Sequence, residues 1–95
     1  MIATYILRCG DGSYYVGSTR DLDHRMEQHH AGMGCRYTSK RMPIRLVWCR
    51  EFDRIDEAYA LEKTLQGWSR RKREALIEGR FDDLPALSRK HFTVE

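Results

Sequence analysis

Glu62 is a carboxylate on a helix face that is otherwise apolar. Residues 55–66 repeat apolar side chains with a helical period. The face expected to be buried carries Ile55, Ala58, Leu61 and Leu65. Glu62 projects onto this face, where a carboxylate must be paired, protonated or bound to a cation. Pairing with one of the many arginines is one interpretation. A metal ion is the other, because Mg²⁺ is often held by one or two carboxylates, with water and substrate phosphate completing its shell.

A second group of candidate residues lies in the segment YYVGSTRDLDHRMEQHH, residues 14–30. Its helical part should bury Leu22 and Met26, which places His29 between them and Arg25 at the edge of the buried stripe. Both residues can be explained without a function. His29 would be a hydrogen-bonded core histidine, and Arg25 would pack its aliphatic part on the protein while its guanidinium reaches solvent.

Gly17 lies at the point where the strand-like part of this segment becomes helical. Glycine weakens a strand and often marks a bulge or the close approach of another group. Just before a helix, Gly17 would leave room for something at the N-terminus of that helix. The tyrosines around it, Tyr5, Tyr14 and Tyr15, are also explained by ordinary strand packing.

The elements that must position these residues follow from the pattern of the chain. Strands are expected over residues 2–9, 13–18 and 45–52, which are rich in β-branched and aromatic side chains. Helices are expected up to Ala31, over residues 57–66 and over residues 69–78, each ended by a glycine. The candidate N-caps are Ser18 or Thr19, Asp53 or Asp56, and Ser69. Residues 32–44 are expected to form a basic loop.

The order β-β-α-β-α-α indicates an α+β fold, with a small three-stranded antiparallel sheet flanked by three helices. The length of 95 residues suits one domain. We expect this domain over residues 1–80 and a short C-terminal tail over residues 81–95.

The turn GDG, residues 10–12, decides which tyrosines share a face of the sheet. A two-residue turn would pair Cys9 with Tyr14 and put Tyr5 and Tyr15 on opposite faces. A three-residue loop would pair Cys9 with Ser13 and put both tyrosines on one face. Such loops commonly end in a left-handed glycine, so a three-residue loop or a compensating bulge is predicted.

Composition and charge restrict the class of protein. No apolar run is long enough for a membrane span, and no signal peptide is visible, so no membrane partner is expected. Three cysteines without close spacing favour reduced thiols in a cytoplasmic protein. The net charge is +3. Basic blocks over residues 20–45 and 68–80 surround an acidic block over residues 51–63, which indicates either a polyanion-facing surface or a solvated face.

Taken together, TYIL, YVG, Arg25, His29 and Glu62 resemble the GIY-YIG nuclease superfamily, and its small stand-alone bacterial members in particular. The family pattern is a tyrosine in the first strand, then tyrosine-x-glycine, an arginine on the next helix and a glutamate on a later helix. The corresponding residues here are Tyr5, Tyr15-Val16-Gly17, Arg25 and Glu62. The resemblance covers about residues 1–78. The first triplet, Ala3-Thr4-Tyr5, lacks the glycine and isoleucine of the pattern.

The resemblance implies a metal-dependent endonuclease that hydrolyses phosphodiester bonds in DNA, with DNA a better candidate than RNA. It implies that Glu62 holds one Mg²⁺ or Mn²⁺ and that Arg25 contacts the phosphate. Tyr5 would take a proton from the attacking water, Tyr15 would position it, and His29 would share the proton transfer. Tyr5, Tyr15, Arg25 and Glu62 should converge on one surface cleft. The residues expected to grip the nucleic-acid backbone are Arg36, Lys40, Arg41, Arg45, Arg70, Arg71, Lys72 and Arg73.

Other functions stay open. The chain has no asparagine, although many family members carry one beyond the glutamate. A catalytically weak or inactive nucleic-acid-binding module that keeps the GIY-YIG fold is therefore the alternative. A zinc protein using His29, His30, Cys35 and Cys49 has spacing that fits no standard zinc pattern. A scaffold without a ligand would leave Glu62 and Gly17 unexplained.

Overall fold

The computed structural model describes residues 1–85 and 88. The strands are β1 (Ile2–Arg8), β2 (Tyr14–Thr19) and β3 (Arg45–Phe52). The helices are α1 (Leu22–His30), α2 (Arg36–Ser39), α3 (Ile55–Gln66) and α4 (Arg70–Ile77), followed by the 3₁₀ turn η1 (Phe81–Asp83). The strands form one antiparallel sheet in the order β2-β1-β3, which confirms the predicted α+β fold. No helix in this part of the chain is long and apolar enough to cross a membrane.

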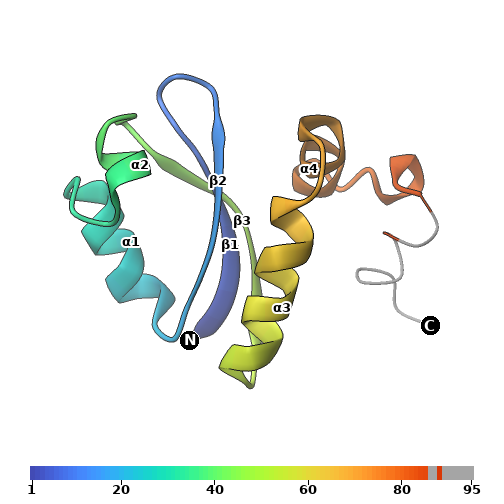
Figure 1. The fold of residues 1–95 in the computed structure, drawn as a ribbon, viewed down its shortest axis with the longest axis horizontal. Coiled ribbons are helices and arrows are strands. Elements are labelled where there is room, and N and C mark those ends of the chain that lie inside the picture. Colours follow the sequence, from blue (N-terminus) through green and yellow to red (C-terminus); the bar gives the residue numbers. More distant parts are fainter. Residues whose placement is uncertain (86–87, 89–95) are drawn as a thin grey trace.

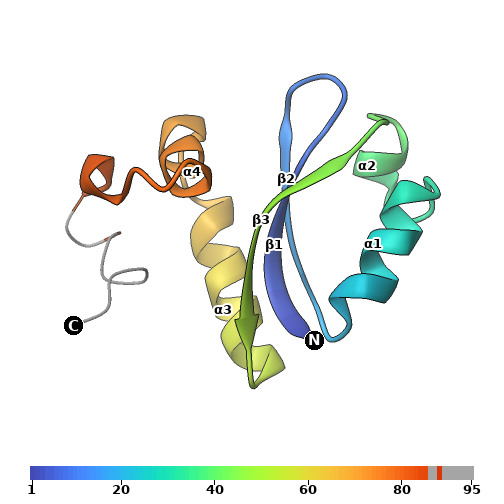
Figure 2. The same cartoon turned by 180° about the vertical axis from the view of Figure 1, so that it is seen from behind.

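The central strand β1 contributes to two cores, because alternate residues of a strand face opposite sides of the sheet. Tyr5 and Leu7 pack on one side with Met26 of α1. Ile6 packs on the other side with Leu61 of α3. Figure 1 shows α1 and α2 on one side of the sheet and α3 and α4 on the other. Figure 2 shows the same layers from behind, where β3 crosses in front of β1.

The hairpin between β1 and β2 has the predicted three-residue loop. The Cys9 amide donates to the Ser13 carbonyl over 2.8 Å, and the Gly12 amide donates to the Cys9 carbonyl over 2.9 Å. Gly12 has a φ of 86°, the left-handed conformation that such a loop needs at its end. The register that follows places Tyr5 and Tyr15 on the same face of the sheet, as predicted.

The start of α1 differs from the prediction. Asp21, not Ser18 or Thr19, is the N-cap, and its carboxylate accepts from the His24 amide over 3.2 Å. The reason is that β2 continues through Thr19, whose hydroxyl is bound to the backbone of Asp21. The sheet ladder therefore uses the residues that a local capping pattern would assign to the helix.

The start of α3 also differs, whereas the start of α4 is confirmed. Arg54 is the N-cap residue of α3 and makes no capping hydrogen bond through its side chain. Neither Asp53 nor Asp56 caps the helix, and the Asp56 carboxylate instead accepts from Arg54 over 3.0 Å. Ser69 caps α4 as predicted, since its hydroxyl accepts from the Lys72 amide over 3.3 Å.

The segment predicted as a basic loop, residues 32–44, contains the short helix α2. Four residues are too few to show a helical period, so the sequence gives no signal for this turn. Tertiary contacts hold it in place: Thr38 is fully buried, and the Gly10 amide donates to the Arg41 carbonyl over 2.7 Å. The helix α2 therefore packs against α1 and the hairpin loop.

The chain beyond α4 also contributes to the core. Leu84 is 2% exposed in the cluster that contains Leu76, and Phe81 packs against the same cluster. We propose that the folded domain reaches Leu84 rather than ending at residue 80. The rest of the predicted tail, residues 86–87 and 89–95, lies outside the described residues.

Candidate functional site

Tyr5, in the middle of β1, is the buried centre of the site. Its side chain is 1% exposed, and Gly17 is its partner in the β1–β2 ladder. A Cβ atom at Gly17 would lie 2.5 Å from the Tyr5 hydroxyl oxygen and 2.7 Å from the ring carbon that bears it. The room at Gly17 is therefore filled by Tyr5 itself, and not by a group at the N-terminus of α1 as the sequence suggested.

The Tyr15 ring lies beside this centre. Its centroid is 6.5 Å from that of Tyr5 and 5.7 Å from that of His29. On its outer side it meets Tyr37 of α2 at 5.8 Å, and the Arg41 guanidinium lies 3.8 Å from the centre of the Tyr37 ring. A row of tilted aromatic rings, ending at the Arg41 guanidinium, thus leads outward from the buried phenol of Tyr5.

His29 connects Tyr5 to α2 through hydrogen bonds on both ring nitrogens. Its Nε2 is 3.0 Å from the Tyr5 hydroxyl, and its Nδ1 is 3.0 Å from the Thr38 hydroxyl. All three side chains are buried. The interpretation of His29 as a hydrogen-bonded core histidine is correct, and its partner Tyr5 is also the residue predicted to accept the proton.

Two residues that touch His29 were missed by sequence reasoning. Thr38 lies in the segment predicted as a loop, where nothing indicated a buried hydroxyl. Gly34 packs directly on the imidazole, since a Cβ atom there would lie 2.1 Å from Nδ1. The only sequence signal for Gly34 is the pair of glycines in GMG, which a loop explains equally well.

Burial and the Arg25 guanidinium set the protonation of the site. Burial raises the pKa of the Tyr5 phenol, and Arg25 opposes this increase without cancelling it. Burial also raises the pKa of Tyr15. Burial first, and then the charge of Arg25, lower the pKa of His29 to about 4. At neutral pH both phenols are therefore protonated and the imidazole is neutral.

Glu62 approaches the same strand from the α3 side. Its carboxylate accepts a short hydrogen bond from the Ser18 hydroxyl and a second, of 2.9 Å, from the Gln66 amide. The arginine pairing considered from the sequence is not found, because no ion pair to Glu62 exists among residues 1–85 and 88. The carboxylate is held by neutral donors, and its charge contributes to raising the pKa of Tyr5.

The five residues predicted to be catalytic therefore meet around the edge strand β2. Tyr5, Tyr15 and His29 lie on the α1 side, and Arg25 acts on the phenols from the same side. Glu62 lies on the α3 side and is joined to β2 through Ser18. Gly17 lies on β2 between Val16 and Ser18, next to the Tyr5 hydroxyl.

The surroundings of Glu62 limit which metal ion it could hold. Among the described residues no group of three or more His, Cys, Asp or Glu side chains could hold a metal. The zinc site considered from the sequence is thus not formed by His29, His30 and the cysteines that the structure describes. One carboxylate whose charge is not cancelled by a protein cation is sufficient for Mg²⁺ when water and a phosphate supply the other ligands.

The basic residues predicted to bind nucleic acid fall into two classes. Some guanidinium groups are already occupied by the protein: Arg73 donates to the Leu65 and Gln66 carbonyls at the end of α3, each over 2.9 Å. The other occupied groups are Arg41 with Asp11, Arg70 with Gly12 and Glu74, and Lys72 with Ser88. Within the described ranges, the side chains without such a partner are Arg36, Lys40, Arg45 and Arg71.

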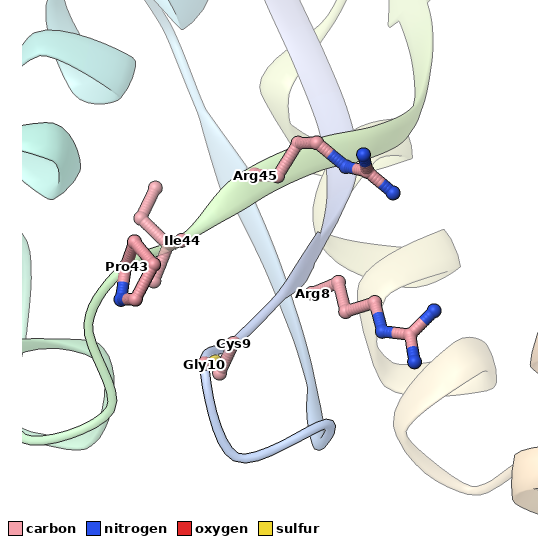
Figure 3. Close-up of a pocket in the computed structure, with 6 residues that line it drawn as sticks. All are labelled: Arg8, Cys9, Gly10, Pro43, Ile44 and Arg45. Carbon is pink, nitrogen blue, oxygen red and sulfur yellow. The ribbon is translucent and has the colours of Figure 1, made fainter.

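Arg45 lies apart from the other basic residues of its segment. It is paired with Arg8 in the β1–β3 ladder. Figure 3 shows both guanidinium groups pointing to the same side, while Pro43 and Ile44 lie on the other. These residues line a hollow of about 420 Å³ that contains none of the predicted catalytic residues. Arg36 and Lys40 instead lie at the two ends of α2, as its first residue and its C-cap, and Tyr37 and Thr38 of this helix contact the site.

The buried state of His29 makes a prediction for stability. The folded protein holds the pKa of His29 at about 4, against 6.5 for an unperturbed histidine. In this range the unfolded chain binds more protons, so stability is complete above about pH 6.5 and falls as the pH decreases toward 4. The expected loss is about 3 kcal/mol. Urea unfolding at pH 7 and pH 4.5 should show a smaller pH dependence for His29→Gln than for the wild type. An equal pH dependence in the two proteins would contradict the neutral buried imidazole.

The α+β fold carries two tyrosines, an arginine and one carboxylate around the edge strand β2. A family model described as the GIY-YIG catalytic domain matches residues 1–75. The chain belongs to the GIY-YIG family.

Individual relatives agree with this assignment. The UPF0213 protein BH0048 from Halalkalibacterium halodurans is 41% identical over 87 residues, which are 88% of this chain and 93% of the relative. The solution NMR structure of the UPF0213 protein BH0048 from Bacillus halodurans is 43% identical, with a TM-score of 0.54 over 81% of this chain and 82% of that chain. The solution NMR structure of EF2693 from E. faecalis is 28% identical, with a TM-score of 0.57 over 88% of this chain and 90% of that chain.

Proposed function

We propose that this protein is a cytoplasmic, divalent-metal-dependent endonuclease that hydrolyses phosphodiester bonds in DNA. One observation carries the proposal. The hydrogen-bonded pair of Tyr5 and His29 lies close to Arg25, and Glu62, which has no ion-pair partner among the described residues, lies at the same edge strand β2. A phosphate at the outer edge of β2 would have the Arg25 guanidinium on the α1 side and the Glu62 carboxylate on the α3 side. Family membership supports nuclease chemistry in general.

Each side chain has a role that its surroundings permit. Arg25 presents planar donors to a phosphate whose negative charge increases in the transition state. Tyr15 orients the attacking water or the phosphate from beside Tyr5. A Mg²⁺ or Mn²⁺ ion on Glu62 would neutralise phosphate charge and stabilise the leaving oxygen when bound.

Proton transfer is assigned to Tyr5 and His29 acting together. Tyr5 is protonated at neutral pH, so it can accept a proton from water only if its own proton leaves. The neighbouring imidazole nitrogen, 3.0 Å away, is the available acceptor. The charge of Arg25 is one cause of the low pKa of His29. A bound phosphate would offset that charge and make His29 more basic in the complex.

The test is incubation of the purified protein with a panel of nucleic acids. The panel contains single-stranded, nicked, branched and duplex DNA and the matching RNAs, each with Mg²⁺, Mn²⁺ or EDTA. We expect internal cleavage of at least one DNA with metal and none with EDTA. Salt-dependent binding without cleavage of any substrate would instead support the inactive binding module, which the absence of asparagine favours. Cleavage that survives EDTA would contradict the metal requirement.

Arg36 and Lys40 provide a prediction for binding. Arg36 is the first residue of α2 and Lys40 its C-cap, and neither side chain has a hydrogen-bond or ion-pair partner in the described part of the chain. Replacing both with alanine should weaken DNA binding without metal and reduce the slope of log K against log salt by about 2, at roughly 0.9 per lost duplex phosphate contact. Fluorescence anisotropy at several salt concentrations measures this slope. Arg54→Ala, an exposed arginine next to α3, is the control and should leave the slope unchanged.

A further inference from the structure

Thr38 is the feature of the site to which the proposed mechanism gives no role. Its hydroxyl is fully buried and 3.0 Å from His29 Nδ1. It also lies 3.3 Å from both the carbonyl oxygen and the sulfur of Cys35. The hydroxyl has a single proton, so the direction of each hydrogen bond in this chain can be worked out.

The assignment of donors and acceptors begins at the Tyr5 hydroxyl. This hydroxyl is protonated and buried, and the nearby Arg25, whose charge opposes the rise in the Tyr5 pKa caused by burial, can only donate. The proton of Tyr5 therefore needs an acceptor, and His29 Nε2 at 3.0 Å is the one acceptor that contacts it in the described structure. Since the imidazole is neutral, Nε2 is without a proton and Nδ1 carries it.

Thr38 completes the chain on the other side of the ring. The single Thr38 proton is donated to the Cys35 carbonyl, so toward His29 the Thr38 oxygen can only accept, and Nδ1 carries the proton independently of Tyr5. Gly34 closes the remaining side, because a Cβ atom there would overlap the ring at 2.1 Å from Nδ1. The imidazole therefore packs directly against the Gly34 backbone, where no side chain would fit.

We propose that Thr38 is a positioning residue that fixes His29 in the Nδ1–H tautomer, so that Nε2 is the proton acceptor for Tyr5. The consequence for catalysis rests on the proposed nuclease function, but the tautomer does not.

This tautomer permits the following proton transfers during hydrolysis. The water oxygen forms the bond to phosphorus as the bond to the leaving oxygen breaks, and the leaving alkoxide takes a proton from solvent water. The water proton passes to the Tyr5 oxygen while the phenol proton passes to His29 Nε2. The resulting imidazolium keeps its Nδ1–H on Thr38. In the other tautomer Nε2 already carries a proton, so Tyr5 would have no acceptor.

Nitrogen-15 NMR of the His29 ring tests the proposal without any substrate. Long-range ¹H–¹⁵N correlations distinguish a protonated from an unprotonated ring nitrogen. At pH 7 we expect Nδ1 protonated and Nε2 unprotonated in the wild type and in Thr38→Ser. In Thr38→Val, which lacks the acceptor, the Nε2–H form should increase. An Nε2–H tautomer in the wild type, or an unchanged Nδ1–H tautomer in Thr38→Val, would overturn the proposal.

Tyr5→Phe is the second variant, and it does not depend on the folding of Thr38→Val. If Thr38 fixes the tautomer, the Nδ1–H form should persist when the phenol hydroxyl is removed. A change to Nε2–H would show that Tyr5 fixes it instead and would refute the role of Thr38.

Cleavage assays supply the functional readout. Positioned proton transfer contributes a factor of about 100 or more to a reaction rate. The cleavage rate should therefore fall by about that factor in Thr38→Val, while Thr38→Ser should retain most of the activity. Full activity in a folded Thr38→Val protein would contradict the positioning role. If the wild type cleaves nothing, the proposed function fails, and the tautomer measurement still decides the assignment to Thr38.

Discussion

Glu62→Gln is expected to reduce the rate of nucleic-acid cleavage several-hundred-fold while leaving the fold intact. The change keeps the size of the side chain and its ability to accept from Ser18, but it removes the charge that would hold the metal. Losing a catalytic charge contact costs about 3 to 4 kcal/mol of transition-state stabilisation. DNA binding without metal should be unchanged or slightly tighter, because a negative charge near the phosphate is lost.

Stability separates this outcome from a structural role for Glu62. Breaking one side of a buried ion pair costs about 3 to 5 kcal/mol. Glu62 has two neutral donors and no ion pair within the described residues, so its neutralisation should change the free energy of unfolding by far less. Glu57→Gln, an exposed glutamate on the same helix, is the control and should affect neither property. A large drop in Tm with cleavage retained would require the metal-site interpretation to be withdrawn.

Gly17→Ala should also have a large effect, through Tyr5. The new methyl group would overlap the phenol, with 2.5 Å to the oxygen and 2.7 Å to the ring carbon. The tyrosine is buried and cannot move without disturbing its bond to His29. Overpacking of this kind costs about 1 to 3 kcal/mol of stability. A displacement of about 1 Å in a reacting group can cost about 100-fold in rate, so cleavage should fall at least that far.

Two further variants test the cause of this effect. Gly67→Ala is the matched control, because its Cβ atom would meet nothing closer than 3.5 Å at the end of α3. Tyr5→Phe combined with Gly17→Ala should lose less stability than the sum of the single changes, since the closest overlap is with the missing oxygen. If chemical denaturation shows that the losses in the free energy of unfolding simply add, the effect of Gly17→Ala does not come from overlap with the Tyr5 hydroxyl.

The sequence predicted the fold where local patterns agree with the tertiary structure. The hairpin is the clearest case, because GDG favours a left-handed Gly12 and that geometry fixes the shared face of Tyr5 and Tyr15. The placement of His29 on a buried stripe also followed from helical periodicity alone.

The remaining features depend on contacts between distant segments. Ser18 was expected to cap α1 but bonds to Glu62, 44 residues away in the sequence. Thr38 and Gly34 lie in a segment without periodicity, and both act only because α2 folds back onto His29. Local rules cannot detect such residues, since one hydroxyl or one missing Cβ atom leaves no pattern in the chain.

Paramagnetic broadening by Mn²⁺ is the measurement that tests most directly whether Glu62 and Arg25 serve one metal-bound phosphate across β2. Amide spectra of the ¹⁵N-labelled protein are recorded as Mn²⁺ is added, with and without a short DNA duplex. We expect selective broadening at Gly17, Ser18 and Glu62, stronger with DNA present and lost in Glu62→Gln. Broadening centred on the acidic stretch around Asp53 and Asp56, or broadening that persists in Glu62→Gln, would contradict the account.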